Sequence, residues 1–128
     1  MKALSVCQPW AWAIIHGPKR IENRTRPTRH RGPLLIHASK SQRYRGGDYS
    51  GLLPDLPPWE ELVFGALIGV VDVVDCVPFA EVEDDPFAIG PWCWVLDRPR
   101  SFSPVSCKGR VNLFNVATSI QEPSQCGQ

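Results

Sequence analysis

The stretch GPKRIENRTRPTRHRGPLLIHAS, residues 17–39, holds two expected strands joined by a basic loop. Gly17 and the proline after it break regular structure, so a helix before them must end here, with Gly17 as its left-handed cap. Residues 19–24 are typical of a strand, and the apolar run within residues 33–39 is typical of an interior strand. The loop between them, residues 25–32, carries proline and glycine as turn signals. The stretch therefore predicts a sheet that contains both strands.

The chain on both sides of this stretch adds more strands than helices. A short helix that is apolar on nearly every side is expected at residues 10–16, and it should be largely buried. Further strands are expected from apolar and β-branched runs at residues 2–6, 64–77, 91–102 and 109–116. About six strands with one to three short helices predict an α+β fold, namely a small, mostly β barrel whose helices close its ends.

Two details of these strands are also predicted. Asp72 and Asp75 interrupt the longest strand at a spacing of three rather than two, so a bulge or bend is expected between them. In the last strand, alternation places Val111 and Leu113 on one face and Phe114 on the other.

The composition is that of one globular domain. The chain has 128 residues, of which 43% are hydrophobic and 21% charged, so it can bury a single core. We expect the domain to span residues 1–118 and a flexible C-terminal tail to span 119–128. No apolar stretch approaches the roughly 20 residues that cross a bilayer, and no cleavage site follows the apolar N-terminus, so no membrane association is expected.

Cysteine and histidine residues indicate neither a disulfide framework nor a metal site. The five cysteines are an odd number without paired Cys-x-x-Cys spacing or secretory context, which favours a reduced, cytoplasmic setting. No His or Cys pair stands at ligand spacing, so no zinc and no other cofactor is expected. His37 follows an apolar strand, and a hydrogen-bonded core histidine is favoured over a catalytic one. The oligomeric state is left open.

The charges are distributed very unevenly along the chain. Residues 19–45 contain nine Lys or Arg and one acid, a net charge of +8, whereas residues 46–97 contain eleven Asp or Glu and no Lys or Arg. This asymmetry predicts a dipolar molecule whose basic side meets a polyanion while its acidic side repels it. The alternative is that both runs are solvated surface.

Three of these charges can meet where the strand at 19–24 begins. On a strict strand, Glu22 and Arg24 share one face while Lys19 points to the other. If Lys19 belongs instead to the preceding turn, its four-carbon stem can curl back and bring the ammonium beside the carboxylate and the guanidinium. Lys19 and Arg24 can then hold a phosphate or a base edge, with Glu22 orienting Arg24. The alternative is that Glu22 and Arg24 only tie the strand to its neighbour.

Four motifs resemble those of the ASCH domain family, and they occur in the family's order over residues 3–116. The motifs fall on Gln8, Pro9 and Trp10; on Gly17, Lys19, Glu22 and Arg24; on His30, Arg31, Gly32, Leu34 and Ile36; and on Gly65, Gly69, Val71, Asp75 and Cys76. The resemblance implies a fold like the PUA barrel. It also implies a ligand among RNA, DNA and modified bases, and it narrows the ligand class more than the reaction.

The resemblance and the charge pattern together select the expected binding residues. We expect a basic surface around a small pocket between Gln8 and Arg24, where the amide of Gln8 can read a base edge unless it serves as a helix cap. The expected contacts to nucleic acid are Gln8, Trp10, Lys19, Arg24, Arg26, Arg29, His30, Arg31, Lys40, Arg43, Tyr44 and Arg45. Nothing in the sequence selects among RNA, DNA and a free nucleoside as the partner.

An enzyme is the main alternative to a binding module. Some relatives in this family hydrolyse acetylated cytidine, and they resemble this chain at Lys19 and Arg24 but carry a catalytic threonine where Glu22 stands. Lys19 and Glu22 can still form a general-base pair if burial lowers the pKa of the lysine. A metal-independent ribonuclease would also use Lys19. A third class, a protein-binding adaptor, would use the apolar segment 52–59.

Overall fold

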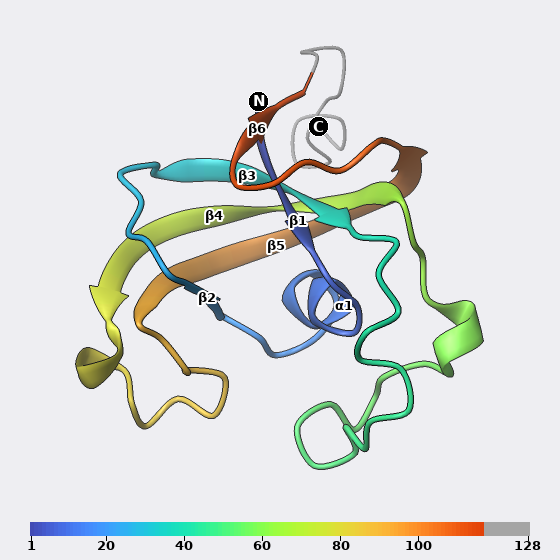
Figure 1. Cartoon of the computed structure of the whole chain (residues 1–128), viewed down its shortest axis with the longest axis horizontal. Helices are drawn as coiled ribbons and strands as arrows, with labels where there is room; N and C mark the ends of the chain where they lie inside the picture. Colours follow the sequence, from blue (N-terminus) through green and yellow to red (C-terminus); the bar gives the residue numbers. More distant parts are fainter. Residues whose placement is uncertain (117–128) are drawn as a thin grey trace.

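The computed structural model describes residues 1–116, so the predicted tail at 119–128 lies outside the described residues. The chain forms a six-stranded mixed sheet in the order β2-β5-β4-β3-β1-β6 (Figure 1). The strands are β1 (Lys2–Val6), β2 (Ile21–Arg24), β3 (Gly32–Ala38), β4 (Ala66–Pro78), β5 (Trp92–Ser106) and β6 (Phe114–Asn115). The helix α1 spans Trp10–Ile15, and the 3-10 turns η1 and η2 span Trp59–Glu61 and Phe79–Glu81. The predicted α+β, mostly β fold is confirmed.

The strands form one sheet that is not closed. β1 and β3 run parallel, while every other neighbouring pair in the sheet is antiparallel. β2 and β6 are the outer strands, and within residues 1–116 no backbone pairing joins them. The helix α1 lies against one side of this sheet, where it packs on β3, β4 and β5 (Figure 1).

An arginine side chain caps the C-terminal end of the helix α1. The apolar residues of α1 are mostly buried, and at its end the side-chain Nη1 of Arg20 donates to the carbonyls of Gly17 at 3.0 Å and Ile14 at 3.4 Å. The left-handed cap predicted at Gly17 is wrong: the cap residue is His16, in the right-handed conformation, and Gly17 has no positive φ. Arg20 supplies the hydrogen bonds that a left-handed cap would have made possible.

The interior strand β3 is buried on both of its faces. Leu34 and Ile36 pack into the cluster beneath α1. Leu35 packs on the opposite side of the sheet with Ala3 and Phe114. Burial on both faces explains why β3 is a continuous apolar run instead of an alternating one.

The segment 109–116 departs from the predicted alternation at Val111, although Leu113 and Phe114 pack on opposite sides of the sheet as predicted. Val111 is 86% exposed, whereas Phe114 is 7% exposed and pairs with Ala3 across β6 and β1. The ring of Phe114 also contacts His37 edge-on, at 6.2 Å between centroids. Alternation failed as a guide because only two residues of this segment form a strand. The predicted irregularity in β4 is confirmed, since the register with β5 shifts between Val73 and Asp75.

A buried carboxylate ties β4 to β5. Asp72 is 5% exposed and accepts hydrogen bonds from Arg98 Nε at 2.8 Å and from both terminal nitrogens of Arg100, at 3.2 and 3.3 Å. Burial alone would raise the pKa of Asp72, but the hydrogen bonds from Arg98 and Arg100 outweigh it, so the pKa lies below its usual value.

Candidate functional site

A cavity of about 780 Å³ opens next to β2 and the start of α1. Its walls come from β1, α1, β2, the loop after β2 and three segments that are distant in sequence, within residues 43–52, 86–94 and 112–113. The lining residues are Leu4, Ser5, Val6, Cys7, Trp10, Lys19, Glu22, Asn23, Arg24, Thr25, Arg26, Pro27, Thr28, Arg43, Tyr44, Leu52, Pro86, Phe87, Ile89, Trp94, Asn112 and Leu113. We call this space the first cavity.

Lys19, Glu22 and Arg24 meet in the first cavity. Glu22 Oε2 accepts a hydrogen bond from Arg24 Nε at 2.9 Å and forms an ion pair with Arg24 Nη2 at 2.8 Å, and Glu22 Oε1 lies 3.8 Å from Lys19 Nζ. Lys19 precedes β2, so the alternation of side chains between the two faces of the strand does not apply to it. Its side chain curls back toward Glu22, as predicted for a lysine in the turn. Arg24 Nη2 also donates to the carbonyl of Ser5 at 3.1 Å, which fixes the guanidinium between β2 and β1.

Lys19 is buried although it carries a charge. It is 5% exposed, its Nζ donates to the carbonyl of Ile21, and it lies 5.7 Å from the centroid of the Phe87 ring. Burial lowers the pKa of Lys19, and the carboxylate of Glu22 opposes that change only in part. An ammonium has three protons, so one proton remains for a ligand acceptor after the contacts to Ile21 and Glu22.

Aromatic rings form a second wall of the first cavity. Trp10 meets Tyr44 edge-on, with 5.9 Å between ring centroids, and the guanidinium of Arg43 lies 5.0 Å from the centroid of the Tyr44 ring. Trp94 also lines the cavity, and its Nε1 donates to the carbonyl of Arg26 at 3.2 Å, which holds the loop after β2. Rings and cations at one mouth can stack on a base and contact its phosphate.

Asn23 is a site residue that sequence reasoning missed. Its Oδ1 accepts from the backbone nitrogens of Ile89 at 2.8 Å and Gly90 at 2.9 Å, and its Nδ2 donates to the carbonyl of Phe87 at 2.9 Å. These bonds hold the loop before β5 against β2, where it becomes a wall of the cavity. The available signal was an asparagine within a strand, a residue that strands disfavour.

Half of the residues predicted to contact nucleic acid lie outside the first cavity. Trp10, Lys19, Arg24, Arg26, Arg43 and Tyr44 line the first cavity, while Gln8, Arg29, His30, Arg31, Lys40 and Arg45 do not. Gln8 is 1% exposed, with Oε1 accepting from the backbone of Trp12 and Nε2 donating to Val63, both at 2.9 Å. Gln8 therefore links α1 to the segment before β4. This role is close to that of a helix cap, which was the predicted alternative to reading a base edge.

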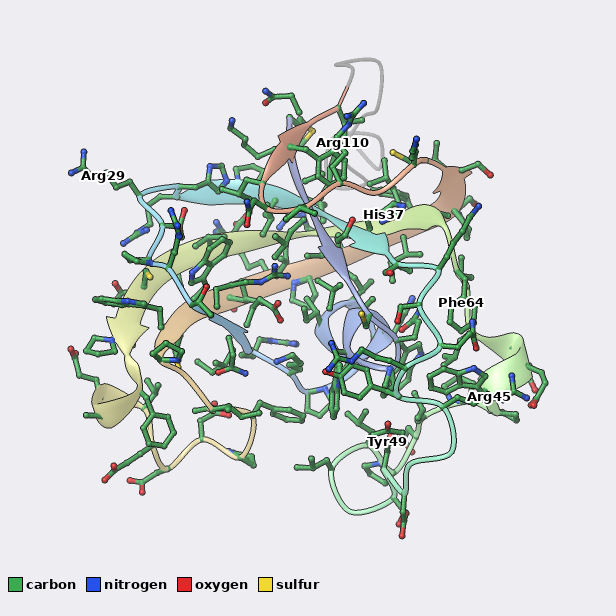
Figure 2. All side chains as sticks on the ribbon, in the orientation of Figure 1. Arg29, His37, Arg45, Tyr49, Phe64 and Arg110 are labelled. Atoms are coloured by element: carbon green, nitrogen blue, oxygen red, sulfur yellow. The ribbon has the colours of Figure 1, made fainter. Side chains whose placement is uncertain are left out.

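The predicted basic residues outside the first cavity point in several directions. Figure 2 shows Arg29 and Arg45 at opposite sides of the molecule. Arg45 pairs with Glu60 at 3.0 Å and Arg31 with Asp75 at 3.8 Å, while His30 donates through Nε2 to the carbonyl of Pro33. The acids Glu81 and Glu83, which follow β4 in the chain, do not line the first cavity either.

Ion pairs decide which cations remain available for an external anion. Lys19 and Arg24 share Glu22, and other arginines pair with Asp72, Asp75 and Glu60. Within the described part of the chain, the cations whose side chains make neither an ion pair nor a hydrogen bond are Lys2, Arg26, Arg29, Lys40, Arg43, Lys108 and Arg110. Arg26 and Arg43 belong to the first cavity.

Neither a metal cluster nor a membrane-spanning helix occurs in residues 1–116. No group of three or more His, Cys, Asp or Glu side chains gathers there as metal ligands, and no helix there has the length and apolarity to span a bilayer. The cysteines Cys7, Cys76, Cys93 and Cys107 are free thiols.

Comparison with known proteins relates the chain to one family. A family model described as the ASCH domain matches residues 4–106. The chain is 35% identical over 140 residues to activating signal cointegrator 1 of Homo sapiens, an alignment that covers 97% of the chain and 24% of that protein. Its similarity to the Mus musculus protein of the same name is 35% over 82 residues, covering 58% of the chain and 14% of that protein. The chain thus spans at most 24% of the length of these curated relatives.

Solved structures show the same fold at low identity. The crystal structure of ASCH from Zymomonas mobilis matches with a TM-score of 0.59 and 14% identity, covering 91% of this chain and 87% of that one. A mutant of the same Zymomonas mobilis protein matches with a TM-score of 0.60 and 12% identity, covering 91% and 90%. At these identities the likeness concerns the fold alone.

Proposed function

The chain belongs to the ASCH domain family, and on this premise we propose that it binds nucleic acid by holding one unstacked base, with its phosphate, in the first cavity. The ligand is RNA or DNA, or a nucleotide released from either. Single-stranded segments and flipped-out bases are the forms of nucleic acid that expose a base for such a pocket. The proposal concerns this domain and not the activity of the much longer relatives.

The observation that carries the proposal is the position of the Lys19, Glu22 and Arg24 cluster within a partly apolar cavity of about 780 Å³. This volume falls in the range of about 300–1,000 Å³ that is usual for small-ligand sites, which are mainly apolar with a few convergent polar groups. A nucleobase has two apolar faces and a polar edge, and the cavity offers aromatic rings together with hydrogen-bond donors.

The charges around the cavity support an anionic ligand. Among residues 1–116, Glu22 is the only acid in its lining, and two cations already neutralise it. Arg26 and Arg43 add two exposed guanidinium groups without carboxylate partners in residues 1–116. The cavity therefore carries an excess of positive charge, which favours a phosphate next to the base.

A binding titration with matched variants tests the proposal. We would titrate the protein with single-stranded RNA, single-stranded DNA and duplex DNA at two salt concentrations, and follow fluorescence anisotropy. Lys19→Met keeps the apolar stem and removes the ammonium, and Tyr44→Ala removes the ring. Both should weaken single-strand binding, each by about 1–3 kcal/mol for a lost charged hydrogen bond or stacking contact. The control Arg45→Gln, outside the cavity, should leave affinity nearly unchanged; equal losses in all three variants would overturn the proposal.

A metal-independent hydrolase acting on acylated nucleosides or RNA is the second candidate function. The specific observation in its favour is the buried Lys19, because burial lowers its pKa and raises the fraction of neutral amine that can accept a proton. Incubation with acetylated cytidine and with single-stranded RNA, without metal, tests it. Product that disappears in Lys19→Met would support the hydrolase, and binding without product would favour the binding module.

A reducing, cytoplasmic location accompanies this proposal. The four described cysteines are free thiols, as suits a protein that meets nucleic acid inside the cell. Treatment with an oxidant and mass spectrometry of the intact protein would test whether these thiols stay reduced when the protein is isolated from the cytoplasm.

A further inference from the structure

A second cavity of about 930 Å³ adjoins the first one. It is formed by β1, the ends of β3 and β5, the residues just before β4 and the segment after β5. Its lining residues are Ser5, His37, Ser39, Lys40, Phe64, Gly65, Ser106, Cys107, Lys108, Gly109, Arg110 and Val111. In Figure 2, Arg110 lies above β3, on the side away from α1.

The charge of the second cavity is uniformly positive. The part of its lining that comes from residues 1–116 contains Lys40, Lys108 and Arg110 but neither Asp nor Glu. All three side chains are without ion-pair and hydrogen-bond partners in residues 1–116, in contrast to Arg31 and Arg45, which have acidic partners. Three unpaired cations facing one hollow form a site for an anion.

Lys40 is held in place by the backbone beneath it. Gly65 has φ of +71°, and a Cβ there would lie only 2.8 Å from Lys40 Cε and 3.1 Å from Lys40 Cγ. The lysine stem therefore lies flat across the glycine, and less rotamer freedom is lost when its ammonium binds an anion. Hydroxyl groups of Ser39 and Ser106 in the same lining can donate further hydrogen bonds.

The segment 108–113 separates the two cavities. Residues 108–111 line the second cavity, Asn112 and Leu113 line the first one, and Ser5 lines both. A hydrogen bond to Cys107, the residue before this segment, holds it in place: His37 Nε2 donates to the carbonyl of Cys107 at 2.5 Å. The other ring nitrogen, His37 Nδ1, is hydrogen-bonded to Ser5 Oγ at 2.9 Å. Because a carbonyl only accepts, Nε2 carries a proton, and in the neutral imidazole Nδ1 then accepts from the serine.

Gly109 is required for this close anchoring. A Cβ at position 109 would lie 2.6 Å from Ser5 Oγ and 2.7 Å from His37 Cε1. The backbone of the segment thus rests directly on the serine and histidine pair. This contact places Lys108 and Arg110 on either side of a fixed point, at the rim of the second cavity.

We propose that the second cavity binds a backbone phosphate of the same nucleic acid strand whose base occupies the first cavity. The strand would cross the segment 108–113, with the exposed Val111 beneath it. This inference rests on the proposed function of the first cavity and extends it, because it assigns an oligonucleotide instead of a free nucleoside as the ligand. The cations Lys108 and Arg110 were not among the contacts expected from the sequence.

A comparison of ligand lengths and charge-matched variants tests this inference. The probes are uridine, uridine monophosphate and short single-stranded oligo(U), together with their thymidine counterparts, titrated at several salt concentrations. Affinity should rise from the mononucleotide to the oligonucleotide. Lys108→Gln with Arg110→Gln should reduce oligonucleotide affinity on the order of tenfold at low salt and lower the salt slope by about 0.7 per lost phosphate contact, leaving nucleoside binding unchanged.

The control has the same change in net charge. Lys2→Gln with Arg29→Gln removes two unpaired cations that line neither cavity. Its oligonucleotide affinity should stay near that of the unaltered protein. Equal losses in both double variants would indicate binding by diffuse charge and would overturn the second cavity as a site, as would an unchanged affinity of the Lys108→Gln, Arg110→Gln protein.

A second readout separates this inference from the proposed function. Pyrophosphate, added to protein labelled with nitrogen-15, should shift the backbone amide signals of Gly65 and Gly109, and the double substitution of Lys108 and Arg110 should abolish the shift. If pyrophosphate shifts these signals but nucleosides do not perturb the first cavity, the anion site stands while the base-binding function fails. If nucleosides bind and pyrophosphate leaves both amides unmoved, the first cavity stands alone and the inference is overturned.

Discussion

Glu22 presents its two carboxylate oxygens to different cations, and Oε2 contacts both Nε and Nη2 of Arg24, through a hydrogen bond of 2.9 Å and an ion pair of 2.8 Å. Oε1 is left for Lys19, 3.8 Å away. The two cations therefore depend on one acid, and the three residues do not contribute equally to stability. Glu22 is the member whose loss leaves charge without a partner.

Removal of Glu22 should destabilise the fold more than removal of Lys19. Glu22→Gln leaves the buried ammonium of Lys19 without a counter-charge, which costs about 3–5 kcal/mol when a buried pair is broken. Lys19→Met removes that ammonium and keeps the pair of Glu22 with Arg24, so it should be neutral or stabilising. Urea unfolding at neutral pH measures both effects. A larger loss in Lys19→Met would show that the lysine is a structural requirement.

Binding that depends on Lys19 should fail in alkaline solution earlier than an ordinary lysine contact would. Because burial lowers the pKa of Lys19, its ammonium is lost as the pH rises through that lowered value, while arginine contacts stay charged. Affinity for single-stranded oligonucleotide should fall over this range in the unaltered protein and remain flat in Lys19→Met. Parallel pH profiles for the two proteins would contradict the role of the ammonium.

The same titration should affect stability with the opposite sign. Between the lowered pKa of folded Lys19 and the ordinary value of the unfolded chain, the unfolded state binds more protons, so this group makes stability rise with pH. Urea unfolding of the unaltered protein and of Lys19→Met across this range gives the difference. The free energies of unfolding of the two proteins should converge as the pH increases.

A bound base should change tryptophan fluorescence through Trp10 and Trp94. Both indoles line the first cavity, whereas Trp59, which donates to Gln42 Oε1 at 2.7 Å, lines neither cavity. A base near an indole alters its emission, so Trp10→Phe and Trp94→Phe should each remove part of the signal change upon binding. Trp59→Phe is the matched control and should keep that change. A signal lost only with Trp59 would place the ligand elsewhere.

Asp72→Asn should weaken the β4 and β5 hairpin. The carboxylate accepts charged hydrogen bonds from Arg98 and Arg100, so its loss should cost about 1–3 kcal/mol of unfolding free energy. Its lowered pKa means that this contribution is present above the ordinary aspartate pKa and is lost as the pH falls through the lowered value. The difference between the two proteins should therefore vanish in strong acid. Asp55→Asn, at an exposed position, is the control and should have little effect.

The parts of the fold that depend on neighbouring residues in the sequence were predictable. The bounds of β1 agree with the prediction, and the irregularity in β4 was visible from the spacing of Asp72 and Asp75. The segment around Phe114 was not predictable from alternation, because its burial depends on pairing with β1 across more than a hundred residues. The capping of α1 by Arg20 also depends on where a long side chain turns, which no local pattern specifies.

The candidate site was predictable only in its central cluster. Lys19, Glu22 and Arg24 lie within six positions of one another, so turn and strand geometry was enough to bring them together. The other parts of the cavity depend on tertiary packing. One example is the loop before β5, which Asn23 holds against β2 through a hydrogen bond to Phe87. The run of basic residues at 19–45 did not predict which cations lie on one surface. Side chains that neighbour one another in a loop can point to different sides of the molecule.

The segment 108–113 is a partition with a fixed foot, since His37 and Ser5 hold it at Cys107 and Gly109. If a bound group shifts this segment, the shift that widens one cavity narrows the other. We then expect the occupancies of the two cavities to be thermodynamically linked, and by reciprocity each ligand group would change the affinity for the other by the same factor.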